Sequence, residues 1–277
     1  MKITERRIEA FRAQLVEEEK AESTIDGYIR YVRDFEKFLH GGEVSKNALI
    51  AFKAYLKSKH RTARGVNTVL AGCNTFLRFA GLEQMCVKPL KIQRQTYYPE
   101  EKLLSKEEYM RLVSAAREAG DEKTEMLFLT LAGTGIRVGE LPFITVEAAK
   151  EGEATVTLKG KTRTVFLVPA LREKLVEFAK RNGIETGSVF RDRDGKDLPR
   201  MCVWKRLKRF CEAAGVEPQK VHPHELRHLF ARVFYAEEKD IATLADILGH
   251  GSVNTTRIYI MTTGEEHRKK LEKMNLV

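Results

Sequence analysis

The sequence contains few cysteines, and none lies in a pattern typical of a disulfide framework or a zinc site. Its 277 residues include four cysteines and no Cys-x-x-Cys pair. The cysteines are scattered through apolar patterns, which favours buried positions in the core over pairing or metal binding. We therefore expect reduced thiols and neither disulfides nor zinc ligands. The four are Cys73, Cys86, Cys202 and Cys211.

Long apolar runs are also missing. No run approaches the ~18 residues that a membrane-spanning helix needs, and Met1 leads directly into a charged helical pattern. We therefore predict a cytoplasmic protein with no membrane partner. The chain has no internal repeat or low-complexity tract.

Acidic side chains are outnumbered by basic ones. The chain has 39 Asp and Glu against 49 Lys and Arg, a net charge of +10 and a pI near 9.4. This balance favours a polyanionic partner such as nucleic acid, although many basic proteins bind none. Glu140 and Glu225 follow Arg137 and His224 closely, but neither has a second acid at metal-ligand spacing. Nothing suggests a two-metal nuclease, and we predict no metal and no cofactor.

The length exceeds one typical domain, so two domains are expected. Residues 1–92 show four apolar stripes at helical spacing, and the Gly41-Gly42 pair ends the second. Ser23 or Thr24 is the expected cap of that helix. The stripes use Ile8, Phe11 and Leu15; Tyr28, Val32, Phe35 and Leu39; Leu49, Phe52 and Leu56; and Val69, Cys73, Phe76, Leu77 and Ala80.

A basic segment lies between the third and fourth predicted helices. Residues 57–64 carry five basic side chains and no acid, and residues 1–92 hold 17 Lys and Arg against 11 Asp and Glu, or +6 of the total charge. A solvated turn is the alternative for such a run. The concentration of charge favours phosphate contacts instead. The candidate DNA-binding residues are Lys57, Lys59, Arg61 and Arg64.

The helical period fades over residues 93–104, which we interpret as a linker. A second domain, residues 105–277, then opens with a capping box at Ser105 and Glu108. Strands 154–158 and 164–168 would form a hairpin around a basic turn, residues 159–163. The fold class is thus mostly α with a small antiparallel sheet. Helices are predicted at 105–119, 126–132, 171–182, 199–214, 223–235, 240–248, 252–259 and 265–274.

Several residues of the second domain suit phosphodiester exchange without a metal. Arg137 and Arg227 carry permanently charged guanidinium groups, each able to bind two oxygens at once. They can stabilise the negative charge that develops on nonbridging phosphate oxygens. His224 lies one helical turn before Arg227, so both can face one cleft. For His-x-x-Arg alone, a surface arginine and a core histidine would be the better interpretation.

Tyr259 is the candidate nucleophile. A phenol has a pKa near ~10, so it needs nearby cations or a base to attack near neutral pH. Two arginines and two histidines could supply both. Packing is the ordinary role of a tyrosine in this position, and a zinc site built from His222, His224, His228 and His250 is a further alternative.

The conjunction of motifs resembles the tyrosine recombinases, in particular Xer recombinases and integrases of mobile elements. The motifs are Thr134-Gly-Ile-Arg-Val-Gly-Glu-Leu141, His224-Glu-Leu-Arg-His228, Leu248-Gly-His250 and the tyrosine nine residues later. The resemblance spans nearly the whole chain. It implies an N-terminal four-helix, SAM-like core-binding domain, a linker and a catalytic domain.

The resemblance also implies a role for each site residue. Tyr259 would attack the scissile phosphate and form a 3′-phosphotyrosine, Arg137 and Arg227 would clamp the phosphate, His250 would donate a hydrogen bond to it, and His224 would assist proton transfer. Glu140 would support Arg137. The family's lysine, which protonates the departing 5′-oxygen, would be Lys159, which closes the first strand and precedes the glycine. Because the turn is one residue short, Lys161 is the alternative.

As a family member the chain would act on double-stranded DNA with a specific core site, as a homotetramer that exchanges strands through a Holliday junction in integration, excision or Xer-type resolution. The predicted helix at 265–274 would dock on a neighbour or on its own domain. Two alternatives stay open at this point: a type IB topoisomerase, which relaxes DNA, and a noncatalytic DNA-binding protein.

Overall fold

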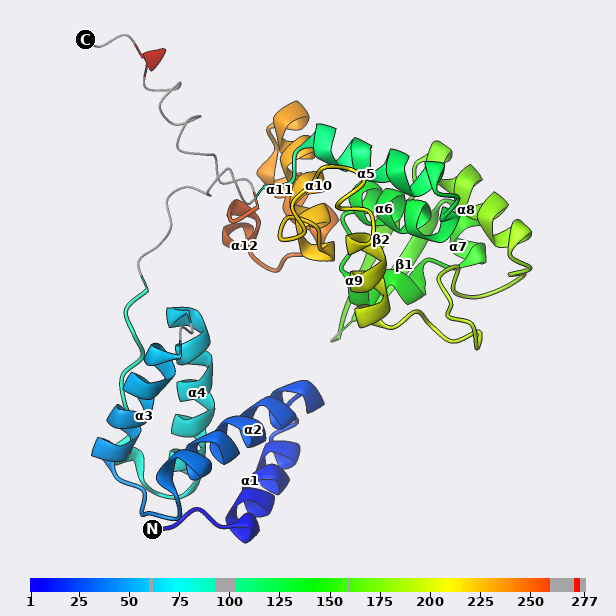
Figure 1. Cartoon of the computed structure of the whole chain (residues 1–277). Helices are drawn as coiled ribbons and strands as arrows, with labels where there is room; N and C mark the ends of the chain where they lie inside the picture. Colours follow the sequence, from blue (N-terminus) through cyan, green and yellow to red (C-terminus); the bar gives the residue numbers. More distant parts are fainter. Residues whose placement is uncertain (60–61, 93–102, 159, 260–271, 275–277) are drawn as a thin grey trace. The chain divides into compact units, whose positions relative to one another are not determined.

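The computed structural model describes residues 1–59, 62–92, 103–158, 160–259 and 272–274 (Figure 1). The chain divides into two compact units, Met1–Arg94 and Gln95–Val277. Both are helical apart from one two-stranded antiparallel sheet, which confirms the predicted fold class. The boundaries at 92 and 105 stay a prediction, and most of the predicted linker lies outside the described residues.

The first unit is built from the four predicted helices. The apolar stripes predicted from the sequence form its core, in which Phe11, Phe35, Phe52 and Phe76 are each about 1% exposed. Helices α2 and α4 approach closely at Gly72, where an added Cβ would lie 3.0 Å from the Tyr31 ring. The elements are α1 (Glu5–Glu17), α2 (Glu22–Leu39), α3 (Lys46–Ser58), α4 (Ala63–Phe79) and the 3₁₀ helix η1 (Glu83–Met85).

One predicted cap is wrong. Helix α2 begins at Glu22, so Ser23 and Thr24 lie inside its first turn and Ala21 holds the capping position without a side-chain bond. Of the basic segment, Lys57 lies in the last turn of α3, Lys59 caps that helix and Arg64 lies in the first turn of α4, while Arg61 lies outside the described residues.

The second unit is organised around α6. This helix is apolar on most sides and packs against α5, α8, α9 and α10. The predicted capping box at Ser105 and Glu108 starts α5. The elements are α5 (Lys106–Glu118), α6 (Glu122–Thr134), η3 (Val138–Phe143), α7 (Val146–Glu151), β1 (Glu153–Leu158), β2 (Lys161–Phe166), α8 (Pro169–Arg181), α9 (Arg200–Lys208), α10 (Pro223–Glu238), α11 (Ile241–Leu248) and α12 (Val253–Arg257).

The hairpin has a shorter turn than predicted, and its second strand begins earlier. Leu158 pairs with Lys161 and Val156 with Arg163, so residues 161–163 belong to β2 and only 159 and 160 separate the strands. Gly160 has φ +73°, a conformation that permits so short a connection. Arg163 therefore lies within strand β2.

Other differences concern helix ends. Helix α9 ends at Lys208, six residues earlier than predicted, because the chain continues through turns to Gly215, which has φ +60°. The short elements η3 and α7 were not predicted, because neither is long enough to show a period. Most of the predicted helix at 265–274 lies outside the described residues. Within the described part of the chain, no helix has the length and apolar character needed to cross a membrane.

Candidate active site

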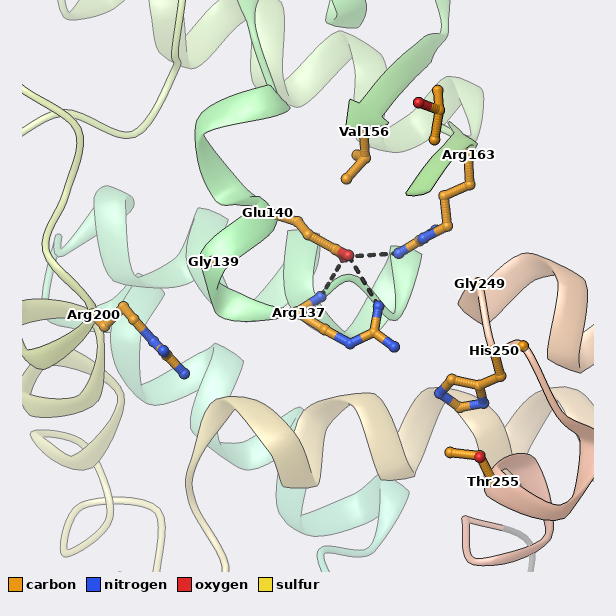
Figure 2. Close-up of a pocket in the computed structure, with 11 residues that line it drawn as sticks. Arg137, Gly139, Glu140, Val156, Arg163, Arg200, Gly249, His250 and Thr255 are labelled. Atoms are coloured by element: carbon orange, nitrogen blue, oxygen red, sulfur yellow. Dashed lines mark hydrogen bonds and ion pairs between the residues drawn. The ribbon is translucent and has the colours of Figure 1, made fainter. Parts of the chain in front are cut away.

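Four separate segments of the second unit meet at one pocket of about 760 Å³. Figure 2 shows the Glu140 carboxylate between Arg137 and Arg163, with His250 below them in the view and Arg200 at the left. Arg137 follows α6, Arg163 lies on β2, and His250 follows α11. Arg200, the first residue of α9, lines the same pocket and was not singled out from the sequence. The packing of α10 against α6 and α11 brings Arg227 to this place.

Arg227 is the most deeply held cation of the site. Its side chain is 1% exposed, and Nη1 donates to the Gly135 carbonyl at 2.6 Å while Nη2 donates to the Leu248 carbonyl at 2.6 Å. Burial, assisted by the charge of Arg137, lowers its pKa to about 10. The guanidinium therefore stays charged at neutral pH. The interpretation of Arg227 as a surface residue is excluded.

His250 is a neutral acceptor in this arrangement. Its Nε2 lies 2.9 Å from Nη2 of Arg227 and its Nδ1 lies 2.8 Å from Oγ1 of Thr256. Because a guanidinium only donates, Nε2 accepts and Nδ1 carries the proton. Burial and the neighbouring arginines lower the pKa of His250 to about 4, in agreement with this assignment.

Glu140 connects two arginines. It is 1% exposed; its Oε1 lies 3.1 Å from Nη1 of Arg137 and its Oε2 lies 2.7 Å from Nη2 of Arg163. Oε2 also accepts from the Arg137 backbone N–H at 2.7 Å. Figure 2 shows all three contacts. Glu140 thus lies beside Arg137 as expected, and Arg163 joins them unpredicted because residues 159–163 were read as a turn.

Tyr259 lies against three histidine rings. Ring centroids are 4.3 Å apart with His228, 5.2 Å with His250 and 5.4 Å with His224. The guanidinium carbon of Arg227 is 5.8 Å from the Tyr259 centroid. The side chain is 8% exposed, and it also packs with Ala231, Leu244 and Leu248.

The histidines of α10 differ in their surroundings. Burial lowers the pKa of His224, with contributions from Arg227 and Arg137, and it lowers the pKa of His228 to about 3. His222 caps α10 by accepting from the Glu225 N–H, and it stacks on Trp204. Within the described ranges, no three His, Cys, Asp or Glu side chains are placed to hold a metal.

Glu225, the neighbour of His224, does not line the pocket but binds the backbone just before α5. Its Oε1 accepts from the Leu104 N–H at 3.2 Å, and its side chain is 1% exposed. Burial raises its pKa to about 7. Nη2 of Arg232 donates to the carbonyl of the same Leu104, so both backbone groups of this residue are bound to α10.

The lysine is the least defined member of the predicted set. Lys159 lies outside the described residues, and Lys161 is the first residue of β2. Both therefore stay predictions.

A phenol beside a buried arginine, next to a pocket with further guanidinium groups, combines a potential nucleophile with cations that can stabilise negative charge. Residues 102–266 match the phage integrase family. The chain belongs to this family and is a tyrosine recombinase, an enzyme of site-specific DNA recombination that cleaves and rejoins DNA strands.

The similarity extends over almost the full length. The chain is 31% identical to tyrosine recombinase XerA of Thermococcus kodakarensis over 98% of this chain and 95% of that protein. It is 28% identical to XerA of Pyrococcus furiosus over 98% and 94%.

Solved structures share the fold. A crystal structure of XerA recombinase covers 99% of this chain and 100% of its own, with a TM-score of 0.55 and 23% identity. A lambda integrase tetramer bound to a Holliday junction covers 91% and 76%, with a TM-score of 0.74 and 16% identity. XerH bound to its difH substrate covers 89% and 78%, with a TM-score of 0.70 and 18% identity.

Proposed function

We propose that this recombinase exchanges DNA strands through a 3′-phosphotyrosine formed on Tyr259. The observation that carries the proposal is the contact of the Tyr259 ring with Arg227, His224 and His250. These residues come from α10, the segment after α11 and the segment after α12. Their convergence joins a nucleophile to cations and a base.

The charge of the site suits the reaction. Arg137 and Arg163 contact one carboxylate, Glu140, and Arg227 adds a further cation, so the three arginines and one glutamate leave two positive charges. A phosphodiester carries one negative charge, and a second develops on the nonbridging oxygens in the transition state. Cations already in place stabilise that added charge without reorganisation.

Tyr259 Oη attacks phosphorus and passes its proton to His224, whose lowered pKa keeps the imidazole neutral at pH 7. The bond from phosphorus to the 5′-oxygen breaks, and Lys159, or Lys161, protonates that oxygen. A 5′-hydroxyl of the partner strand reverses both steps. One ester replaces another, so no nucleotide cofactor is required.

His250 would change its hydrogen bonds when the phosphate binds. Nε2 now accepts from Arg227, whereas donation to a phosphate oxygen needs a proton on Nε2. The negative charge of the phosphate favours that protonated form. Binding would thus turn both His250 and Arg227 towards the substrate.

The partner is double-stranded DNA with a core site, bound by a homotetramer that passes through a Holliday junction. The lambda integrase structure named above is a tetramer on such a junction, and XerH is bound to its own site. Lys57, Lys59, Arg61 and Arg64 would contact phosphates. The segment 265–274 would dock on the neighbouring protomer.

The proposal is tested by trapping the covalent complex on a library of genomic DNA fragments. Wild-type protein should yield adducts that survive denaturation, and sequencing should return one recurring core site. Tyr259→Phe should abolish the adducts while DNA binding stays within about threefold of wild type, because only the nucleophilic oxygen is lost. Tyr235→Phe, a tyrosine packed against the same cluster, is the matched control and should leave adducts unchanged.

Two plasmids carrying the recovered site separate recombination from simple relaxation. Exchange between the plasmids that depends on the site supports the recombinase. Relaxation without exchange would instead favour the topoisomerase alternative. Adducts that persist in Tyr259→Phe would exclude Tyr259 as the nucleophile.

A further inference from the structure

Arg163 makes contacts that join three parts of the site. Its Nη2 lies 2.7 Å from Oε2 of Glu140, and its Nη1 donates to the Ile247 carbonyl at 2.8 Å. Ile247 lies three residues before His250 and next to Leu248, whose carbonyl accepts from Arg227. One guanidinium thus connects β2 with the carboxylate that contacts Arg137 and with the chain segment that leads to His250 and carries an acceptor of Arg227.

The side chain of Arg163 is confined along its length. It is 12% exposed, and its Nε has no hydrogen-bond partner in the described part of the chain. A Cβ added to Gly249 would lie 2.3 Å from its Cδ. Gly249 also has φ +63°, so glycine at this position both ends α11 and leaves room for Arg163.

A planar, two-pronged donor is needed for this connection. The two Nη groups of a guanidinium point in fixed directions, so they can hold a carboxylate and a carbonyl in one geometry. A lysine ammonium would keep the charge but not this bridge. The contacts of Arg163 are with protein groups, whereas Arg137, on the other oxygen of Glu140, is 41% exposed towards the pocket.

The geometry points to Arg163 as a positioning residue, which holds Arg137 and the chain before His250 in register through the Glu140 carboxylate and the Ile247 carbonyl. This inference rests on the proposed function. It adds a residue that acts on the reaction through others. Its loss should lower the rate of the chemical step more than the affinity for DNA, because positions of catalytic groups change while most DNA contacts persist.

The first test measures the rate constant of covalent-complex formation in a single turnover at saturating core-site DNA. The fraction of protein that is active is determined separately by titration. Arg163→Met should lower the rate constant about 10- to 100-fold and change the DNA Kd less than about threefold. Arg163→Lys keeps the positive charge but not the two-pronged geometry, so it should recover little of the rate. A loss confined to the active fraction, with an unchanged rate constant, would show a merely structural role and overturn the inference.

The second test is a double-mutant cycle with Glu140→Gln. If Arg163 acts through Glu140, Arg163→Met should cost less than about threefold in the Glu140→Gln background. Independent, multiplying losses would show that Arg163 does not act through the Glu140 carboxylate and would overturn the inference as stated. Wild-type adducts on Tyr259 are required in the same assay. Their absence would refute the proposed function and not this inference alone.

The chain offers a matched control outside the pocket. Arg172 donates from Nε to the Ala149 carbonyl at 3.2 Å, and an added Cβ on Gly152, which has φ +94°, would lie 3.0 Å from its Nη1. The pair resembles Arg163 with Gly249. Arg172→Met and Gly152→Ala should leave the rate constant unchanged, whereas Gly249→Ala should lower it as Arg163→Met does. Equal effects of the two glycine variants would overturn the assignment.

Discussion

At the scale of single residues, the site is defined by which acceptors surround each cation. Arg227 is bound to two backbone carbonyls and one imidazole, and a buried charge persists only with such compensation. Arg137 keeps an exposed guanidinium beside Glu140. Under the proposed function, Arg137 would therefore reach a phosphate directly, whereas Arg227 would first have to exchange hydrogen-bond partners.

The two candidate lysines can be separated by changing the leaving group. An alkoxide is far more basic than a thiolate, whose conjugate acid has a pKa near ~8.5, so a substrate with sulfur at the bridging 5′ position needs no general acid. We expect Lys159→Ala to lose roughly 10²- to 10⁴-fold in cleavage of normal DNA and to recover most of it on the sulfur substrate.

Lys161→Ala serves as the matched variant in the same experiment and should cleave both substrates at nearly the wild-type rate. Cleavage rates are read from denaturing gels. The reverse pattern would assign the general acid to Lys161.

At the scale of elements, the site depends on how closely α6 and α10 approach. Gly135 ends α6 with φ +63°, and a Cβ there would lie 2.5 Å from the Phe230 ring on α10. The carbonyl of Gly135 accepts from Arg227. The turn that ends α6 thus sets the helix spacing and one partner of the buried arginine.

Gly135→Ala should therefore weaken both stability and catalysis. A left-handed conformation costs an alanine about 1–2 kcal/mol and overpacking about 1–3 kcal/mol more, and the displaced carbonyl should slow covalent-complex formation. Gly120→Ala is the control, because Gly120 has φ +67° with nothing within 4 Å of an added Cβ. Denaturant unfolding and single-turnover rates measure the two effects. Equal losses for both variants would contradict the packing argument.

At the scale of the whole molecule, buried neutral histidines should make folding stability depend on pH. His228 is 3% exposed, and burial lowers its pKa to about 3. The unfolded chain takes up a proton near pH ~6.5, whereas the folded chain resists it. The contribution of His228 to the free energy of unfolding is fully present above pH ~6.5. It falls by about 1.4 kcal/mol per pH unit as the pH drops towards 3.

Comparison of wild type with His228→Phe isolates this contribution. As the pH falls from 6.5 to 4.5, the unfolding free energy of wild type should decrease more than that of His228→Phe. Trp204, the single tryptophan, reports unfolding of the second unit by fluorescence. Parallel stability curves for wild type and His228→Phe would contradict the prediction.

Much of this organisation was predictable because it depends on neighbours along the chain. Apolar residues at helical spacing predicted the four helices of the first unit, and the Ser105 capping box marked the start of α5 correctly. The predicted cap of α2 was wrong, because the helix already starts at Glu22 and Ser23 and Thr24 therefore lie inside its first turn. Local patterns indicate a helix more reliably than its first residue.

The sequence by itself determined most of the longer helices, the basic charge and the candidate site residues, since periodicity and motif spacing are local properties. Only the tertiary structure decided what those side chains touch. Arg227 meets a carbonyl 92 residues away, and Arg163 became part of the site because strand pairing placed it in β2 beside Glu140. Contacts between distant segments follow from how helices and strands pack, and that packing is not written in any one segment.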